Sequence, residues 1–214
     1  MTDEVNLSPT AGATHDTLSQ FIVYACPVGP LAEQLDYYLQ ASLKQCGANA
    51  AHRYMPHCTL TGFFHEVESS IPRYVQALEQ SLTRAQQTRL HQPIVIRALS
   101  FNDDWHGLEI EADWLKTLVD DFSKHADSST RPDEIRLKSW LHLSLAYKFD
   151  LSHAAQLRDL AEAHVNIESD VNWELRYYQR LKELNTDTTT VSQTEKPIET
   201  YGGDRWICHH AWKL

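Results

Sequence analysis

The sequence has no hydrophobic run close to the ~20 residues that a membrane-spanning helix requires. Its first residues, MTDEVNLSPTAGATHD, are acidic and polar, without the basic and then apolar segments of a secretory signal peptide. The four cysteines are scattered and include no CxxC pair, so we expect free thiols. These absences predict a soluble, cytoplasmic protein with a flexible segment over residues 1–19 and a single domain over residues 20–214.

Glycine and positive charge are scarce as well. Seven glycines leave no glycine-rich phosphate loop, and a net charge of −10 without a Lys/Arg-rich run disfavours binding to long nucleic acid. The 12 histidines form no HExxH motif, and the consecutive Cys208, His209 and His210 would alternate between the two faces of a strand. We therefore expect no metal site and no cofactor, and a small phosphate ester in preference to a polymer.

Hydrophobic patterning predicts an α+β fold in which strands and helices alternate. The predicted helices cover residues 30–46, 70–85, 113–122 and 152–165. The predicted strands cover residues 20–28, 58–64, 93–102, 105–113, 139–149, 171–181 and 205–214. A polar stretch over residues 185–204 predicts a loop, which is either a lid or an excursion without fixed structure.

A short phrase occurs twice, as HCTL at residues 57–60 and as HLSL at residues 142–145. In a strand, side chains two residues apart share a face about 7 Å apart, so His57 accompanies Thr59 and His142 accompanies Ser144. One HxT triplet carries little information. Two copies that share the leucine favour a site where two halves of one domain face each other.

The surrounding residues, MPHCTLTGFF and LHLSLAYKF, resemble the two signature strands of the two-histidine (2H) phosphoesterase superfamily, also called LigT-like. The residues after each motif most closely resemble the 2H domain of the ubiquitin-associated and SH3-domain-containing proteins, over roughly residues 20–214. Nothing resembles their ubiquitin-binding, SH3 or histidine-phosphatase modules. The resemblance implies a bilobal fold, with two pseudo-symmetric lobes whose antiparallel sheets line a central cleft and whose helices lie outside.

The resemblance also implies metal-independent cleavage of 2′,3′-cyclic phosphates and related 2′-linked phosphodiesters. Side-chain chemistry agrees, because a neutral imidazole can deprotonate water while an imidazolium protonates the leaving alkoxide. His57 and His142 are therefore the expected catalytic pair, with the roles of base and acid left open. Thr59 and Ser144 are expected to bind the substrate by donating to non-bridging phosphate oxygens.

Weaker candidates lie in phase with the two motifs. Phe63 continues the face of His57 and could stack on a base, with a place in the core as the competing interpretation. Lys148 continues the face of His142 and could hold phosphate, whereas Tyr147 is out of phase and is expected to pack. Arg53 and Lys138 are further cations that could make the cleft locally positive.

The sequence thus predicts a monomeric phosphodiesterase for 2′,3′-cyclic phosphates or 2′-linked cyclic mono- or dinucleotides, with no membrane partner. One alternative is an RNA end-processing enzyme, a 2′-5′ ligase or cyclic phosphodiesterase that acts on short RNA ends. The other is a nucleotide sensor without turnover, which two intact motifs disfavour.

Overall fold

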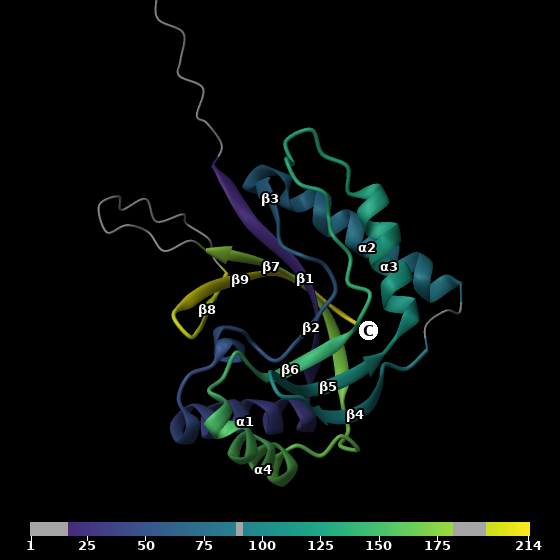
Figure 1. Cartoon of the computed structure of the whole chain (residues 1–214). Helices are drawn as coiled ribbons and strands as arrows, with labels where there is room; N and C mark the ends of the chain where they lie inside the picture. The colour runs from purple at the N-terminus through teal and green to yellow at the C-terminus, as the bar shows by residue number, and fades with distance from the viewer. Residues whose placement is uncertain (1–16, 89–91, 182–195) are drawn as a thin grey trace, which may run out of the picture.

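The computed structural model of the chain describes residues 17–88, 92–181 and 196–214. Within these ranges it contains nine strands and four α-helices (Figure 1). The strands are β1 Leu18–Val28, β2 Cys58–Thr59, β3 Phe64–Val67, β4 Val95–Phe101, β5 Trp105–Glu111, β6 His142–Tyr147, β7 Asn172–Leu181, β8 Ile198–Tyr201 and β9 Asp204–Lys213. The helices are α1 Pro30–Cys46, α2 Ile71–Gln87, α3 Asp113–His125 and α4 Ala154–His164, with short 3₁₀ turns η1 Ala50–Arg53, η2 Glu68–Ser70 and η3 Leu151–His153.

Every strand pairs in antiparallel fashion within one sheet of order β4-β5-β6-β2-β1-β7-β9-β8, and β3 also pairs with β1. The predicted α+β class is therefore confirmed. The two pseudo-symmetric lobes stay a prediction, because the strands form one continuous sheet. Residues 1–16 of the predicted flexible segment lie outside the described residues, and β1 already begins at Leu18. Of the predicted loop, residues 185–195 also lie outside them, whereas Ile198–Tyr201 is a strand paired with β9 and not loop.

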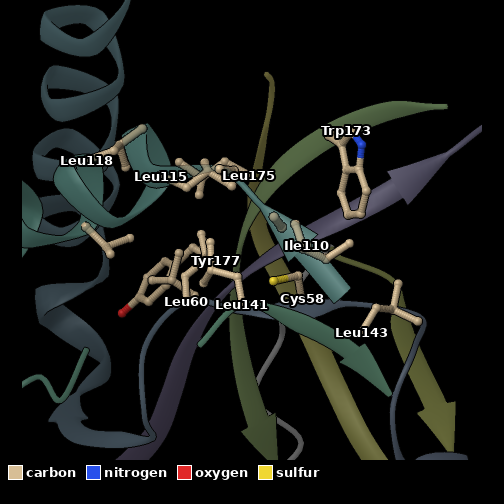
Figure 2. Close-up of a cluster of buried hydrophobic side chains, with 14 of the residues drawn as sticks. Cys58, Leu60, Ile110, Leu115, Leu118, Leu141, Leu143, Trp173, Leu175 and Tyr177 are labelled. Atoms are coloured by element: carbon tan, nitrogen blue, oxygen red, sulfur yellow. The ribbon is translucent and has the colours of Figure 1, made fainter. Parts of the chain in front are cut away.

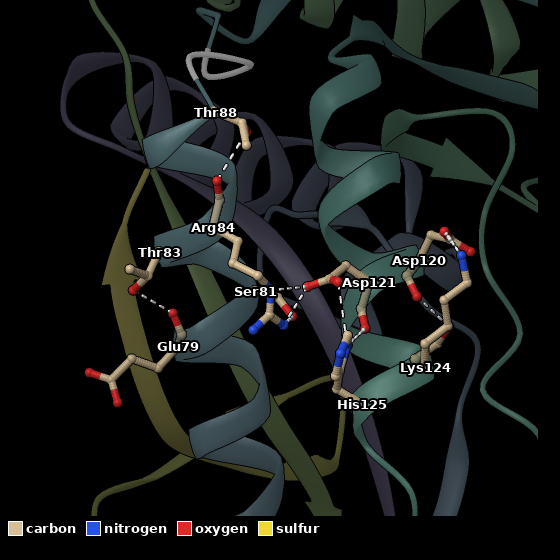
Figure 3. Close-up of polar contacts among 10 residues, drawn as sticks. Glu79, Ser81, Thr83, Arg84, Thr88, Asp120, Asp121, Lys124 and His125 are labelled. Atoms are coloured by element: carbon tan, nitrogen blue, oxygen red, sulfur yellow. Dashed lines mark hydrogen bonds and ion pairs between the residues drawn. The ribbon is translucent and has the colours of Figure 1, made fainter.

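The helices form two packed pairs, α1 with α4 and α2 with α3 (Figure 1). Helix α1 begins at Pro30, whose fixed φ suits a first helical turn, and stops before Gly47, which has a φ of 80°. Between α2 and α3, Arg84 Nε donates to Asp121 Oδ2 over 2.8 Å (Figure 3). Because both side chains are partly exposed, we expect packing of the apolar faces to stabilise this pair more than the ion pair does.

One face of the sheet packs against all four helices and forms the main core. Cys58 and Leu60 from the first motif region, and Leu141 and Leu143 from the second, lie in this core together with Leu115 of α3 (Figure 2). Side chains alternate between the faces of a strand, so burying these residues directs the motif histidines and hydroxyl residues to the opposite face. A smaller, aromatic-rich cluster occupies that opposite face, with Ile22, Tyr24, Cys26, Met55, Tyr178 and Trp206.

Candidate active site

The two motif strands are hydrogen-bonded neighbours. Strand β2 pairs with β6 through Cys58 and Leu143. In an antiparallel register this pairing places His57 across from Ser144, and Thr59 across from His142. Residues directly opposite have Cβ atoms about 4.5–5.5 Å apart, and diagonal neighbours lie about 7–8 Å apart. Each histidine therefore faces the other motif's hydroxyl, and the two imidazoles occupy a diagonal that a phosphate group can span.

All four motif residues line one cavity of about 330 Å³. Phe63 lines it too, so the candidate substrate-binding position of this ring is compatible with the structure. Among the described residues no carboxylate lines the cavity, although the chain as a whole is acidic. Its other lining side chains with polar atoms are Tyr24, Tyr54, Thr61, Trp105, Arg136, Lys138 and Tyr147.

His57 is held in one tautomer. Its Nδ1 donates to the carbonyl oxygen of Met55 over 2.7 Å, which leaves Nε2 as the nitrogen that can accept a proton. Its ring packs on Tyr24, with centroids 4.0 Å apart. Burial lowers the pKa of His57 to about 4, against the opposing effect of the Met55 carbonyl, and His142 lowers it further. His57 is therefore neutral at pH 7, as a general base must be.

His142 packs against two tryptophans. Trp140 stacks on its ring with centroids 3.9 Å apart and planes 27° apart, and Trp105 meets the ring edge-on at 5.4 Å. Burial lowers the pKa of His142, the Trp140 carbonyl opposes this effect, and nearby Lys138 adds to it. An aromatic face stabilises a cation above it, so the Trp140 ring favours the imidazolium that a general acid requires.

Ser144 is oriented by a long-range contact. Trp105 Nε1 donates to Ser144 Oγ over 2.9 Å, so the hydroxyl hydrogen of Ser144 stays available for a substrate oxygen. Gly107, which pairs with Ser144, makes this contact possible. A Cβ on Gly107 would lie 2.3 Å from the Leu143 carbonyl oxygen and 2.4 Å from the Trp105 ring, so any larger residue would displace the indole. The hydroxyl of Thr59 has no hydrogen bond to another described residue.

Two cations reach the cavity from the segment before β6. Gly62 N donates to the Arg136 carbonyl over 2.6 Å, and Lys138 N donates to the Leu60 carbonyl over 3.1 Å. These bonds dock residues 136–138 beside residues 60–62, and both cationic side chains line the cavity. Arg53, by contrast, does not line the cavity. Its Nε donates to Asp204 Oδ2 over 2.7 Å.

Tyr147 lines the cavity and Lys148 does not. This is the reverse of what strict alternation along the strand predicts, which put Lys148 on the face of His142 and Tyr147 on the other face. Strand β6 contains a bulge, since Ser144 pairs with Gly107 and Ala146 with the adjacent His106. The extra residue shifts the alternation by one, which returns Tyr147 to the motif face. Strand β6 ends at Tyr147, and Lys148 is exposed at a φ of 53°.

Sequence reasoning also missed Arg136, Trp105 and Trp140. Trp105 reaches Ser144 through the pairing of β5 with β6, and Arg136 is held beside the first motif by the bond of its carbonyl to Gly62; no local pattern exists for either. Trp140 could have been found, because it precedes His142 by two residues and therefore shares its face. Within the described residues, no group of three or more His, Cys, Asp or Glu side chains could hold a metal ion. No helix in those ranges has the length and hydrophobicity to cross a membrane.

The known proteins to which the chain is similar include the following three. Ubiquitin-associated and SH3 domain-containing protein B of Mus musculus is 30% identical over 194 residues, which are 86% of this chain and 30% of that protein. Ecdysteroid-phosphate phosphatase of Bombyx mori is 32% identical over 77% of this chain and 25% of that protein. Its namesake in Drosophila melanogaster is 28% identical over 85% of this chain and 29% of that protein. The chain thus spans less than a third of the length of these relatives. No protein-family model matches it.

The antiparallel α+β fold and two histidine–hydroxyl pairs on adjacent strands in one cavity define a class of phosphoesterase. Together with the similarity over most of its length, these features show that the chain belongs to the two-histidine phosphoesterase superfamily. The resemblance predicted from the motifs is confirmed. Two of these relatives have a phosphatase activity in their names.

Proposed function

We propose that this chain hydrolyses 2′,3′-cyclic phosphates or 2′-linked cyclic nucleotides without a metal, using His57 and His142 as an acid/base pair. The observation that carries the proposal is the pairing of Cys58 with Leu143, which puts both histidines and both hydroxyls on one wall of a cavity. We retain the two-lobed description as part of this proposal, with β2 and β6 at the seam between the lobes.

We assign the base to His57, because its pKa is about 4 and its tautomer leaves Nε2 free of a proton. His57 Nε2 takes a proton from water as the water oxygen bonds to phosphorus. The bond from phosphorus to one ribose oxygen then breaks, and His142 gives a proton to that oxygen. His142 is the acid because Trp140 stacks on its ring and because the bound phosphate anion raises its pKa.

The developing charge on the non-bridging oxygens meets polar groups of the cavity wall. Thr59 and Ser144 supply hydroxyl donors, and one of the two lining cations, Arg136 or Lys138, supplies positive charge. Such preorganised donors typically contribute about 10²–10³-fold each to the rate. The cavity volume of about 330 Å³ lies near the lower end of the ~300–1,000 Å³ range of small-molecule sites, which favours a mononucleotide unit over a whole cyclic dinucleotide.

The test is product analysis on a panel with 2′,3′-cyclic mononucleotides, cyclic dinucleotides and an RNA that ends in a cyclic phosphate. We expect ring opening of the 2′,3′-cyclic substrates to a single phosphomonoester isomer, unchanged in EDTA and lost in His57→Ala. Efficient turnover of the RNA end alone would favour end processing. Tight binding to the wild type without any product would favour the sensor.

The relatives' names add one comparator to this panel. Because the chain spans only about a quarter to a third of the ecdysteroid-phosphate phosphatases, we do not assign it the activity in their name. A steroid phosphate monoester tests that activity directly. Its hydrolysis in preference to every cyclic phosphate would refute our proposal.

A further inference from the structure

Among the described tryptophans Trp140 is the most exposed, and its ring stacks on His142, which lines the cavity. Its side chain is 51% exposed, an unusual position for an indole. Its inner face stacks on His142 at 3.9 Å. Trp105 lies 5.0 Å from Trp140 and 5.4 Å from His142, and its plane is steeply inclined to both. A ring almost equidistant from two stacked rings lies beside the stack, so Trp105 leaves the outer face of Trp140 open.

Two cations precede this ring on the same segment. Arg136 and Lys138 line the cavity, and neither forms an ion pair with any described residue. A 2′,3′-cyclic phosphate carries a single negative charge, so one of the two cations balances it. The other stays available for a second phosphate. Lys138 precedes Trp140 by two residues, and its charge lowers the pKa of His142.

Resting on the proposed function, we propose that Trp140, Arg136 and Lys138 form an outer subsite for one further nucleotide, joined to the 5′ side of the nucleotide whose cyclic phosphate enters the cavity. Its base stacks on the outer face of Trp140, and the connecting phosphate meets Arg136 or Lys138. The substrate class is then a short oligonucleotide with a 2′,3′-cyclic phosphate end. A free mononucleotide uses the inner cavity alone.

The experiment compares a uridine 2′,3′-cyclic phosphate with the dinucleotide that carries one adenosine on its 5′ side. Stacking of one base on an aromatic side chain corresponds to about 5–150-fold in affinity. We therefore expect wild-type kcat/KM for the dinucleotide to exceed that for the mononucleotide by a factor in this range. Trp140→Leu should lower kcat on both substrates through His142 and should in addition raise KM for the dinucleotide alone, so that the preference is lost. Trp140→Phe should retain part of the preference.

The chain offers a matched control. Tyr37 is another exposed aromatic residue that packs on a histidine, with its ring centroid 4.7 Å from that of His164 on the α1–α4 surface. Tyr37→Leu should leave both substrates unaffected. For the cations, Arg136→Gln and Lys138→Gln should reduce the dinucleotide preference, whereas Lys213→Gln at the end of β9 should not.

Two outcomes overturn the proposal. The first is a wild type without preference for the dinucleotide. The second is a Trp140→Leu variant that loses activity on both substrates by the same factor, because the ring then acts only through His142. Quenching of tryptophan fluorescence by adenylyl-uridine without a cyclic phosphate gives a readout that needs no turnover. If neither cyclic substrate is hydrolysed and this quenching still depends on Trp140, the proposed function fails and the subsite stands.

Discussion

The two hydroxyls of the site should respond differently when they are removed, although the proposed function gives both the same role toward phosphate. Ser144→Ala deletes the oxygen to which buried Trp105 donates at 2.9 Å, whereas Thr59→Val deletes a hydroxyl without a partner among the described residues. Both variants should lose about 10²–10³-fold in kcat, because each removes one donor to the transition state. Only Ser144→Ala also leaves a buried indole N–H without an acceptor.

The cost of that orphaned donor is about 1–3 kcal/mol. For a chain of 214 residues, 1 kcal/mol corresponds to roughly 2–4 °C in Tm, so we expect Ser144→Ala to melt about 2–12 °C lower. Thr59→Val should melt within about 1–2 °C of the wild type, because this substitution leaves no other polar group without a partner.

A double-mutant cycle with Trp105→Phe separates the hydrogen bond from packing. Trp105→Phe removes the donor as well as part of the ring, so Ser144→Ala should be less destabilising in that background by about 1–3 kcal/mol. Thermal and urea unfolding supply the free energies, with matched m-values as the check on two-state behaviour. Additive effects, or equal stability losses in Ser144→Ala and Thr59→Val, would refute the assignment of Trp105 as the group that orients Ser144.

Three further predictions concern the same site and its surroundings. His57→Ala and His142→Ala should each lower kcat by at least ~10²-fold and the double variant little more, with residual rates measured on folded protein. Gly107→Ala should destabilise the protein and lower activity, since its Cβ has no room beside Trp105, and circular dichroism with kinetics would show both effects. Burial lowers the pKa of both His57 and His209 to about 4 in the folded protein, whereas in the unfolded chain both histidines bind protons below about pH 6.5. The free energy of unfolding should therefore fall as the pH drops from about 6.5 to 4. His209→Gln should flatten that dependence in urea titrations, and an unchanged pH slope would argue against a neutral buried His209.

Local patterns predicted much of the fold. The proline at the start of α1 and the glycine after it mark both ends of that helix, and its observed bounds, Pro30–Cys46, match. Alternation likewise predicted that each histidine shares a face with its hydroxyl, because the intervening Cys58 and Leu143 are apolar and buried. Strand β8 was missed because its sequence, IETY, is short and largely polar. It forms a strand only by pairing with β9.

The errors at the site have one physical origin, the arrangement of strands across the sheet. The expectation that Lys148 shares the face of His142 assumed uniform alternation along β6, and a bulge that appears only in the pairing with β5 breaks that alternation. The contact of Trp105 with Ser144 spans 39 residues and depends on the missing side chain of Gly107. Such features belong to two strands at once, so one strand's sequence carries no sign of them.

The charge of the chain and the charge of its cavity have opposite consequences for substrate choice. The net charge of −10 repels a long polyanion, yet no described carboxylate lines the cavity, and Asp204 holds Arg53 away from it. The attraction available to a substrate therefore comes from Arg136 and Lys138, and screening limits it to about 8 Å at physiological ionic strength. Two phosphates can be neutralised within that distance, and a third would find no further lysine or arginine among the described residues that line the cavity. With two contacts, log affinity should fall with log salt at a slope near −1.4, far shallower than that of a polymer-binding protein. On the proposed function we therefore expect the placement of these two cations, more than the net charge, to set the length of nucleotide that the cavity selects.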